Sequence, residues 1–173
     1  MLRSRLPIAV LLLLIPLTAA AQSDSAADPE ALASLFQNMV GEWQCTGSAS
    51  KGLSTASNIS ITAEHGGQVL VYSHVGLEGH TNRSVSIWSF DKPNQGLVVA
   101  RQFVTTDGNF ADVFAGEQWT ENTLVLEARE LWAPLWSENR FLYDLSRPGV
   151  MEIRWEIKKD DWELGDEKVC RRQ

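Results

Sequence analysis

Cysteine is scarce in this chain, which has only Cys45 and Cys170 among its 173 residues. If the two bond to each other, no thiol is left to bind a metal. No cysteine lies near residue 21, the predicted end of a signal peptide described below, so lipid attachment at the cleavage site is not indicated. Basic residues are also few, with 15 lysines and arginines against 22 acidic residues. This balance argues against nucleic acid and anionic membrane surfaces as partners.

Long apolar runs are absent beyond the N-terminus. Arg3 and Arg5 precede an apolar stretch over 6–17, and small residues follow it up to Ala21. This pattern predicts a secretory signal peptide over 1–21, and so an exported protein, either periplasmic or secreted. The stretch is shorter than the roughly 20 residues of a membrane-spanning helix, so no stable span is expected after cleavage. An uncleaved anchor is the alternative. The mature chain would keep 13 basic and 22 acidic residues, a net charge of −9.

Residues 22–40 are predicted to form a polar leader and a short capping helix. Asp28, Pro29 and Glu30 have the order of an N-cap, a first helical proline and a first-turn carboxylate. Gly41 ends the helix. Apolar residues recur at helical spacing in between, at Leu32, Leu35, Phe36, Met39 and Val40. We expect this helix to cap an opening in a sheet.

From residue 41 onward the apolar pattern has a period of two, which predicts strands. Turn residues separate ten of them, over 42–49, 56–64, 68–75, 83–90, 97–104, 110–115, 123–130, 138–145, 150–158 and 162–170. Such spacing is typical of a β-sandwich or an antiparallel barrel. We expect an all-β fold: a single antiparallel up-and-down β-barrel of about ten strands over 41–173. Residues 69–72 are apolar on both faces, so we expect the helix or a partner to cover their outer face.

The two cysteines lie on the first and last predicted strands. In an up-and-down barrel with an even number of strands, these two are antiparallel neighbours. Directly opposed residues can then lie about 4.5 Å apart at Cα, which a disulfide can bridge. If Cys45 faces Cys170, Trp43 faces Arg172, and a guanidinium can pack over the indole. In the alternative, Cys170 lies on a loose tail and the bond crosses at another register.

A short helix, a Gly-x-Trp motif at Gly41 and Trp43, and a basic residue on the last strand, Arg172 or Arg171, together resemble the calycin superfamily, which includes the lipocalins. The wider pattern, with a Gly66-Gly67 turn and an Ile-Trp-Ser-Phe-Asp segment over 87–91, resembles an exported bacterial family of lipocalin-like barrels of unknown function. The resemblance implies barrel closure by Gly41, Trp43 and Arg172, and binding of a small apolar molecule inside. True lipocalins have eight strands, whereas fatty-acid-binding barrels have the ten predicted here.

Aromatic and charged side chains on the inward strand faces are the candidate ligand-binding residues. The aromatic candidates are four of the chain's larger side chains, Trp43, Trp88, Phe103 and Trp155. Arg101 shares its strand face with Phe103, and a buried arginine must be paired or bind an anion. Asp112 and Glu127 are its possible internal partners, and a ligand carboxylate is another. An outward Arg101 is the alternative.

Metal and haem sites are weighed against simpler interpretations. His74, Glu78 and His80 surround one predicted turn and could bind zinc, but exposed loop histidines are the favoured explanation of the pattern. An inward His74 could hold a haem iron. We expect no cofactor and no metal.

We therefore expect a binding protein without catalytic activity, for a small and largely apolar ligand. The alternatives are an interaction module with a filled core, or an enzyme, haem or metal protein that uses the barrel mouth. The sequence has no G-x-S-x-G motif. It leaves the oligomeric state open.

Overall fold

The computed structural model describes residues 28–49, 52–77, 82–91, 96–106, 108–131 and 138–173. The predicted signal peptide over 1–21 and the leader residues 22–27 lie outside the described residues. Among the described residues, no helix has the length and apolar character needed to cross a membrane.

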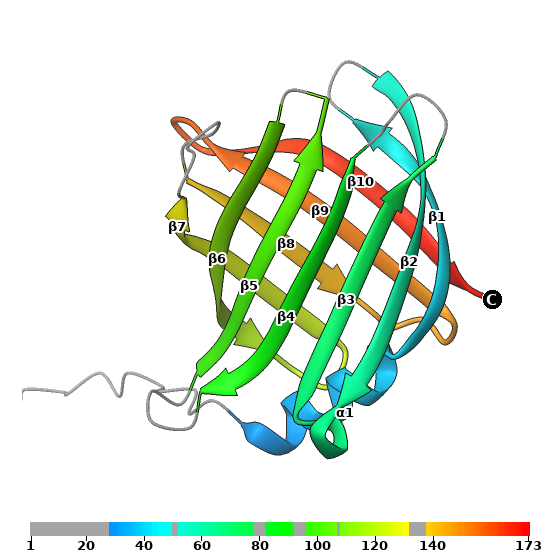
Figure 1. The fold of residues 1–173 in the computed structure, drawn as a ribbon, viewed down its shortest axis with the longest axis vertical. Helices are drawn as coiled ribbons and strands as arrows, with labels where there is room; N and C mark the ends of the chain where they lie inside the picture. Colours follow the sequence, from blue (N-terminus) through cyan, green and yellow to red (C-terminus); the bar gives the residue numbers. More distant parts are fainter. Residues whose placement is uncertain (1–27, 50–51, 78–81, 92–95, 107, 132–137) are drawn as a thin grey trace, which may run out of the picture.

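Within the described residues, one helix precedes ten strands (Figure 1). The helix α1 covers Pro29–Met39, and a 3₁₀ turn, η2, covers His65–Gly67. The strands are β1 Gly41–Ala49, β2 Leu53–Glu64, β3 Val69–Gly76, β4 Arg83–Asp91, β5 Gly96–Thr105, β6 Gly108–Trp119, β7 Thr123–Leu131, β8 Asn139–Asp144, β9 Val150–Lys158 and β10 Trp162–Arg172.

The ten strands form one closed barrel. Each strand pairs antiparallel with its neighbours in sequence, and β1 pairs with β10 to complete the ring. Because each of the ten described strands is paired on both sides, the barrel that they form has no open sheet edge. The predicted all-β, up-and-down barrel is confirmed.

The seam between β1 and β10 has the predicted register. Cys45 lies opposite Cys170 and forms a disulfide with it, and Trp43 lies opposite Arg172. The Arg172 guanidinium lies 4.3 Å from the centre of the Trp43 ring. It also donates hydrogen bonds to the carbonyl oxygens of Asn38, at 2.6 Å, and Val40. One arginine therefore ties the barrel seam to the C-terminal end of α1.

Gly41 makes this contact possible. Its φ of +143° is one that glycine adopts readily, and a Cβ built there would lie 2.6 Å from an Arg172 nitrogen. Trp43 meanwhile donates its indole N–H to the Met39 carbonyl, at 2.9 Å.

The helix α1 closes one end of the barrel (Figure 1). Asp28 caps its N-terminus by accepting from the Glu30 N–H at 2.9 Å. Its apolar stripe is buried against the barrel interior through Leu32, Leu35, Phe36 and Met39. Trp119 at the end of β6 donates to the Asp28 carbonyl at 3.0 Å, which fixes the start of the helix.

Some sequence expectations need correction. β2 begins at Leu53, three residues earlier than predicted, and β6 extends to Trp119. We expected α1 or a partner to cover the outer face of β3. In the structure, α1 lies at the barrel end and does not cover this face. Val71 on that face pairs with Ile87, which is 53% exposed.

Candidate functional site: the barrel cavity

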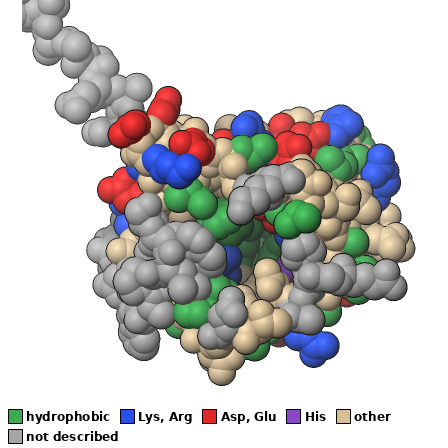
Figure 2. Space-filling model, turned by 90° about the horizontal axis from the view of Figure 1, so that it is seen from above, with side chains coloured by type: hydrophobic (Ala, Val, Ile, Leu, Met, Phe, Trp, Pro, Cys, Tyr) green, Lys and Arg blue, Asp and Glu red, His purple; other side chains and the backbone are tan. Residues whose placement is uncertain are grey.

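A cavity of about 310 Å³ occupies the barrel interior. It lies at the end away from α1, where Figure 2 shows the molecule hollowed. Ligand pockets typically measure about 300–1,000 Å³, so this cavity suits a small molecule. The alternative of an interior filled by side chains does not agree with it.

Aromatic side chains form one wall of the cavity. Tyr72 stacks on Trp88 at 5.5 Å between ring centres, and Tyr143 meets the same indole edge-on at 5.3 Å. Phe141 packs against Phe114 at 5.4 Å. Among the cavity-lining tryptophans, the Trp88 indole N–H donates to the Ser86 hydroxyl at 2.9 Å. Because the protein satisfies this polar atom, the ring contributes mainly apolar surface.

Tyr72 and Tyr143 form a pair of buried phenols in this wall. Burial raises the pKa of each tyrosine above its ordinary value. The neighbouring Arg101 opposes this rise, but desolvation of the phenolate dominates. Both side chains therefore present neutral hydroxyl groups.

Arg101 points into the barrel, in agreement with the inward orientation inferred from its strand face and not with the outward alternative. Its Nε donates to Asp112 Oδ1 at 2.9 Å, and its Nη2 contacts the other carboxylate oxygen. The Asp112 side chain is only 3% exposed. Glu127 is not the partner. The Arg101 guanidinium also lies 4.8–4.9 Å from the ring centres of Phe103, Phe114 and Phe141.

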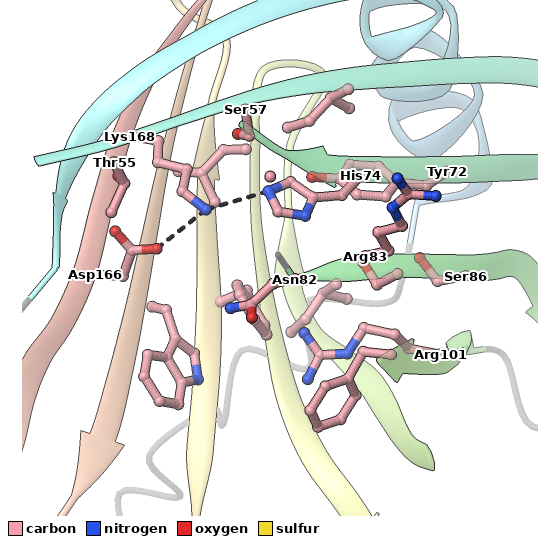
Figure 3. Close-up of a pocket in the computed structure, with 18 of the residues that line it drawn as sticks. Thr55, Ser57, Tyr72, His74, Asn82, Arg83, Ser86, Arg101, Asp166 and Lys168 are labelled. Carbon is pink, nitrogen blue, oxygen red and sulfur yellow. Dashed lines mark hydrogen bonds and ion pairs between the residues drawn. The ribbon is translucent and has the colours of Figure 1, made fainter. Parts of the chain in front are cut away.

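A polar wall lies elsewhere in the cavity, on β2, β3 and β10 (Figure 3). The Lys168 ammonium lies 3.1 Å from Asp166 Oδ2 and 3.3 Å from His74 Nε2. Burial, reinforced by Lys168 and Arg101, lowers the pKa of His74 to about 3. His74 is therefore neutral at pH 7 and can accept a hydrogen bond from Lys168.

A β-bulge on β10 separates the inward Asp166 from the outward Leu164. The register of β10 against β9 shifts between Leu164 and Asp166, so that Gly165 is the extra residue. Asp166 shares the inward face of Lys168 and Cys170 by regular alternation, and the bulge lets Leu164, two residues before Asp166, point outward. A Cβ at Gly165 would lie 2.6 Å from the Trp155 ring, so glycine is needed for this packing.

Four of the five predicted ligand-binding residues, Trp88, Arg101, Phe103 and Trp155, line the cavity. Trp43 does not. Its ring is 2% exposed and packs at the seam under Arg172, so the expectation that it lines the cavity is corrected. Whether these side chains contact a ligand remains a prediction.

Sequence reasoning missed the polar wall on β10. Side chains two residues apart on a strand share a face, so the inward Cys170 already implied an inward Lys168. A second step of the same alternation reaches Asp166, because the register of β10 is regular from Asp166 to Cys170.

Of the possible zinc ligands His74, Glu78 and His80, only His74 is among the described residues. Glu78 and His80 lie outside them, and the described residues include no group of three or more potential metal ligands among His, Cys, Asp and Glu. For the haem hypothesis, His74 does face the cavity, but Lys168 lies beside its Nε2.

Comparisons with known proteins add little. No protein-family model and no curated protein matches the chain. Among solved structures, the chain is similar to one described as EF1p2_mFAP2b bound to DFHBI. That likeness has 14% sequence identity and a TM-score of 0.40, and it covers 82% of this chain and 98% of the other. Similarity this low does not bear on the ligand or on the site.

Proposed function

We propose that this protein is an exported barrel of the calycin type that binds a small, largely apolar molecule without catalysing a reaction. The observation that carries the proposal is the cavity of about 310 Å³ with its aromatic wall. Burial of an apolar ligand against these rings would contribute roughly 25 cal/mol for each Å² of apolar surface removed from water.

Neighbouring side chains hold the charged groups of the cavity wall in place. Arg101 is held by Asp112, and Lys168 is held by Asp166. His74 is neutral at pH 7. Each of these three side chains contacts a neighbouring side chain that fixes its position, as expected of groups that shape a binding site and orient a ligand.

Two features support export and the calycin type. The Cys45–Cys170 disulfide is of a kind that persists in oxidising compartments outside the cytosol. The packing of Arg172 over Trp43 beside the helix is the closure that the calycin resemblance implies. The relation to an exported bacterial lipocalin-like family is part of the same proposal.

Fluorescence titration with N-phenyl-1-naphthylamine, a neutral apolar probe, tests the proposal. We expect saturable binding at one site, with quenching of tryptophan emission because Trp88 and Trp155 line the cavity. Val99 also lines the cavity and is 2% exposed, so Val99→Phe should fill the space and weaken binding.

The matched control is Ala100→Phe, which adds the same ring on the exposed face of the same strand. It should leave probe binding unchanged. Absence of saturable binding by the folded native protein would overturn the proposal. So would equal binding by a Val99→Phe variant that retains its circular dichroism spectrum.

A further inference from the structure

We propose that the ligand carries a neutral hydroxyl group, which binds at a subsite formed by Thr55, Ser57, Asp166 and Lys168. We call these four residues the hydroxyl subsite. The inference rests on the proposed function, and it adds the chemical class of the ligand.

Three atoms of the hydroxyl subsite lack a hydrogen-bond partner within the described protein. They are Thr55 Oγ1, Ser57 Oγ and Asp166 Oδ1. Ser57 is 1% exposed and Thr55 is 9% exposed, yet all three side chains belong to the cavity wall (Figure 3). Buried polar atoms are normally paired, so a ligand that enters must offer them matching groups.

The register of β1 explains how these atoms come together. Thr55 on β2 and Lys168 on β10 both lie opposite Gly47, and Asp166 lies opposite Ala49. The β1 residues between the two polar strands are therefore glycine and alanine, whose small side chains leave room on the inner face. Trp155 packs over Gly165, next to Asp166, and provides apolar surface beside the polar atoms.

The charges of the subsite select among head groups. A ligand carboxylate has no hydrogen to donate to Asp166 Oδ1, and the Asp166 charge repels it. A ligand ammonium could donate, but the Lys168 ammonium already lies 3.1 Å from Asp166. A hydroxyl group can donate to Asp166 and accept from Thr55 or Ser57 without adding charge.

Other cations on the described wall do not change this conclusion. Arg101 is paired with Asp112. Arg83 lines the cavity but is exposed, so water screens its attraction for an anion. Preferential binding of an anionic ligand is therefore the competing outcome for the experiment.

Four compounds with the same ring separate the head groups: 2-methylnaphthalene, 2-naphthalenemethanol, 2-naphthoate and 2-naphthylmethylammonium. Their dissociation constants are measured at pH 7.5 by tryptophan quenching or calorimetry. A hydrogen bond to a charged group predicts that the alcohol binds about tenfold more tightly than the methyl compound. The two charged compounds should bind more weakly than the alcohol.

Two variants assign the preference to the subsite. Asp166→Asn should reduce the alcohol's advantage to about threefold or less, since a neutral acceptor bonds more weakly. It should also strengthen binding of 2-naphthoate, because Lys168 loses its counter-ion. Thr55→Val, which keeps the side-chain shape, should weaken the alcohol but not the methyl compound. Glu167→Gln, at an exposed position on the same strand, is the matched control and should change neither.

The outcomes separate this inference from the proposed function. If no compound binds, the proposed function fails. If the compounds bind but the carboxylate or the methyl compound equals the alcohol, only the hydroxyl subsite is overturned. An alcohol preference that persists unchanged in both folded variants, Asp166→Asn and Thr55→Val, overturns it as well.

Discussion

At the scale of single residues, His74 places a titratable ring inside an apolar barrel. Burial and the nearby Lys168 and Arg101 lower its pKa from 6.5 to about 3. Between these two pH values the unfolded chain binds a proton at His74 that the folded chain does not. The stability contributed by neutral His74 is therefore present above pH 6.5 and is lost as the pH falls toward 3.

We predict that His74→Gln flattens the acid limb of the stability curve. One such group contributes a slope of up to about 1.4 kcal/mol per pH unit. The free energy of unfolding is measured in urea from pH 7.5 to 4.5, and the difference between native protein and variant should shift in favour of the variant as pH falls. His65→Asn, in the exposed η2 turn, is the control. Parallel curves for native protein and His74→Gln would contradict the prediction.

Tyr72 and Tyr143 are the only two tyrosines of the chain, and both lie in the cavity wall. Because burial raises the pKa of both, the native protein should show no phenolate absorbance at 295 nm near pH 10. In urea, both tyrosines should ionise near that pH. The unfolded state thus loses protons first, so stability falls as the pH rises above 10. Ionisation of either tyrosine in folded protein near pH 10 would show that the barrel wall admits solvent there.

At the scale of elements, the bulge in β10 sets which side chains reach the cavity. Gly165 lies directly under the Trp155 ring, and a Cβ there would approach a ring carbon to 2.6 Å. We predict that Gly165→Ala destabilises the protein by about 1–3 kcal/mol, because the crowded indole has to move. Urea unfolding measures the loss, and a shifted tryptophan emission maximum reports the displaced ring.

Glu167→Ala serves as the control for Gly165→Ala, since it alters an exposed side chain of the same strand. Its effect should stay within about 0.5 kcal/mol. A Gly165→Ala protein as stable as the native one would mean that Trp155 does not pack as described.

Strand positions followed from sequence where polar and apolar residues alternate regularly. β9 is the clearest case, with inward Met151 and Ile153 against outward Glu152 and Arg154. The start of β2 was missed because its inward residue Thr55 is polar and faces the cavity instead of the core. The C-terminal end of β6 was missed because an extra residue, Glu117, interrupts its alternation. Errors in the strand bounds thus arise where the barrel departs from a dry interior or a regular ladder.

At the scale of the whole molecule, closure could be predicted because both cysteines and the Trp43–Arg172 pair share one antiparallel register. The cavity could not be predicted. Its size depends on how aromatic side chains from six or more strands fill the interior, and no single strand carries that information. The composition of the wall was predicted only in part, because Lys168 and Asp166 were overlooked although regular alternation from Cys170 places both inward.

The disulfide constrains the whole chain, because 125 residues separate Cys45 from Cys170. In the chain-entropy model, a loop of this length lowers the unfolded state's entropy enough to stabilise the fold by about 4–5 kcal/mol. We predict that reduction lowers the urea midpoint accordingly, measured on the same preparation with and without dithiothreitol. The double variant Cys45→Ala, Cys170→Ala should match the reduced protein and should not respond to dithiothreitol.

The effect of the disulfide should lie mainly in the unfolded state, since the seam also has a full backbone ladder and the Arg172 contacts. Below its lower urea midpoint, the reduced protein should therefore bind N-phenyl-1-naphthylamine within about threefold of the oxidised protein. A reduced protein that keeps its circular dichroism spectrum but no longer binds the probe would contradict this. In that case the sulfur bridge would hold the cavity open directly, because the ladder between β1 and β10 would not close the barrel by itself.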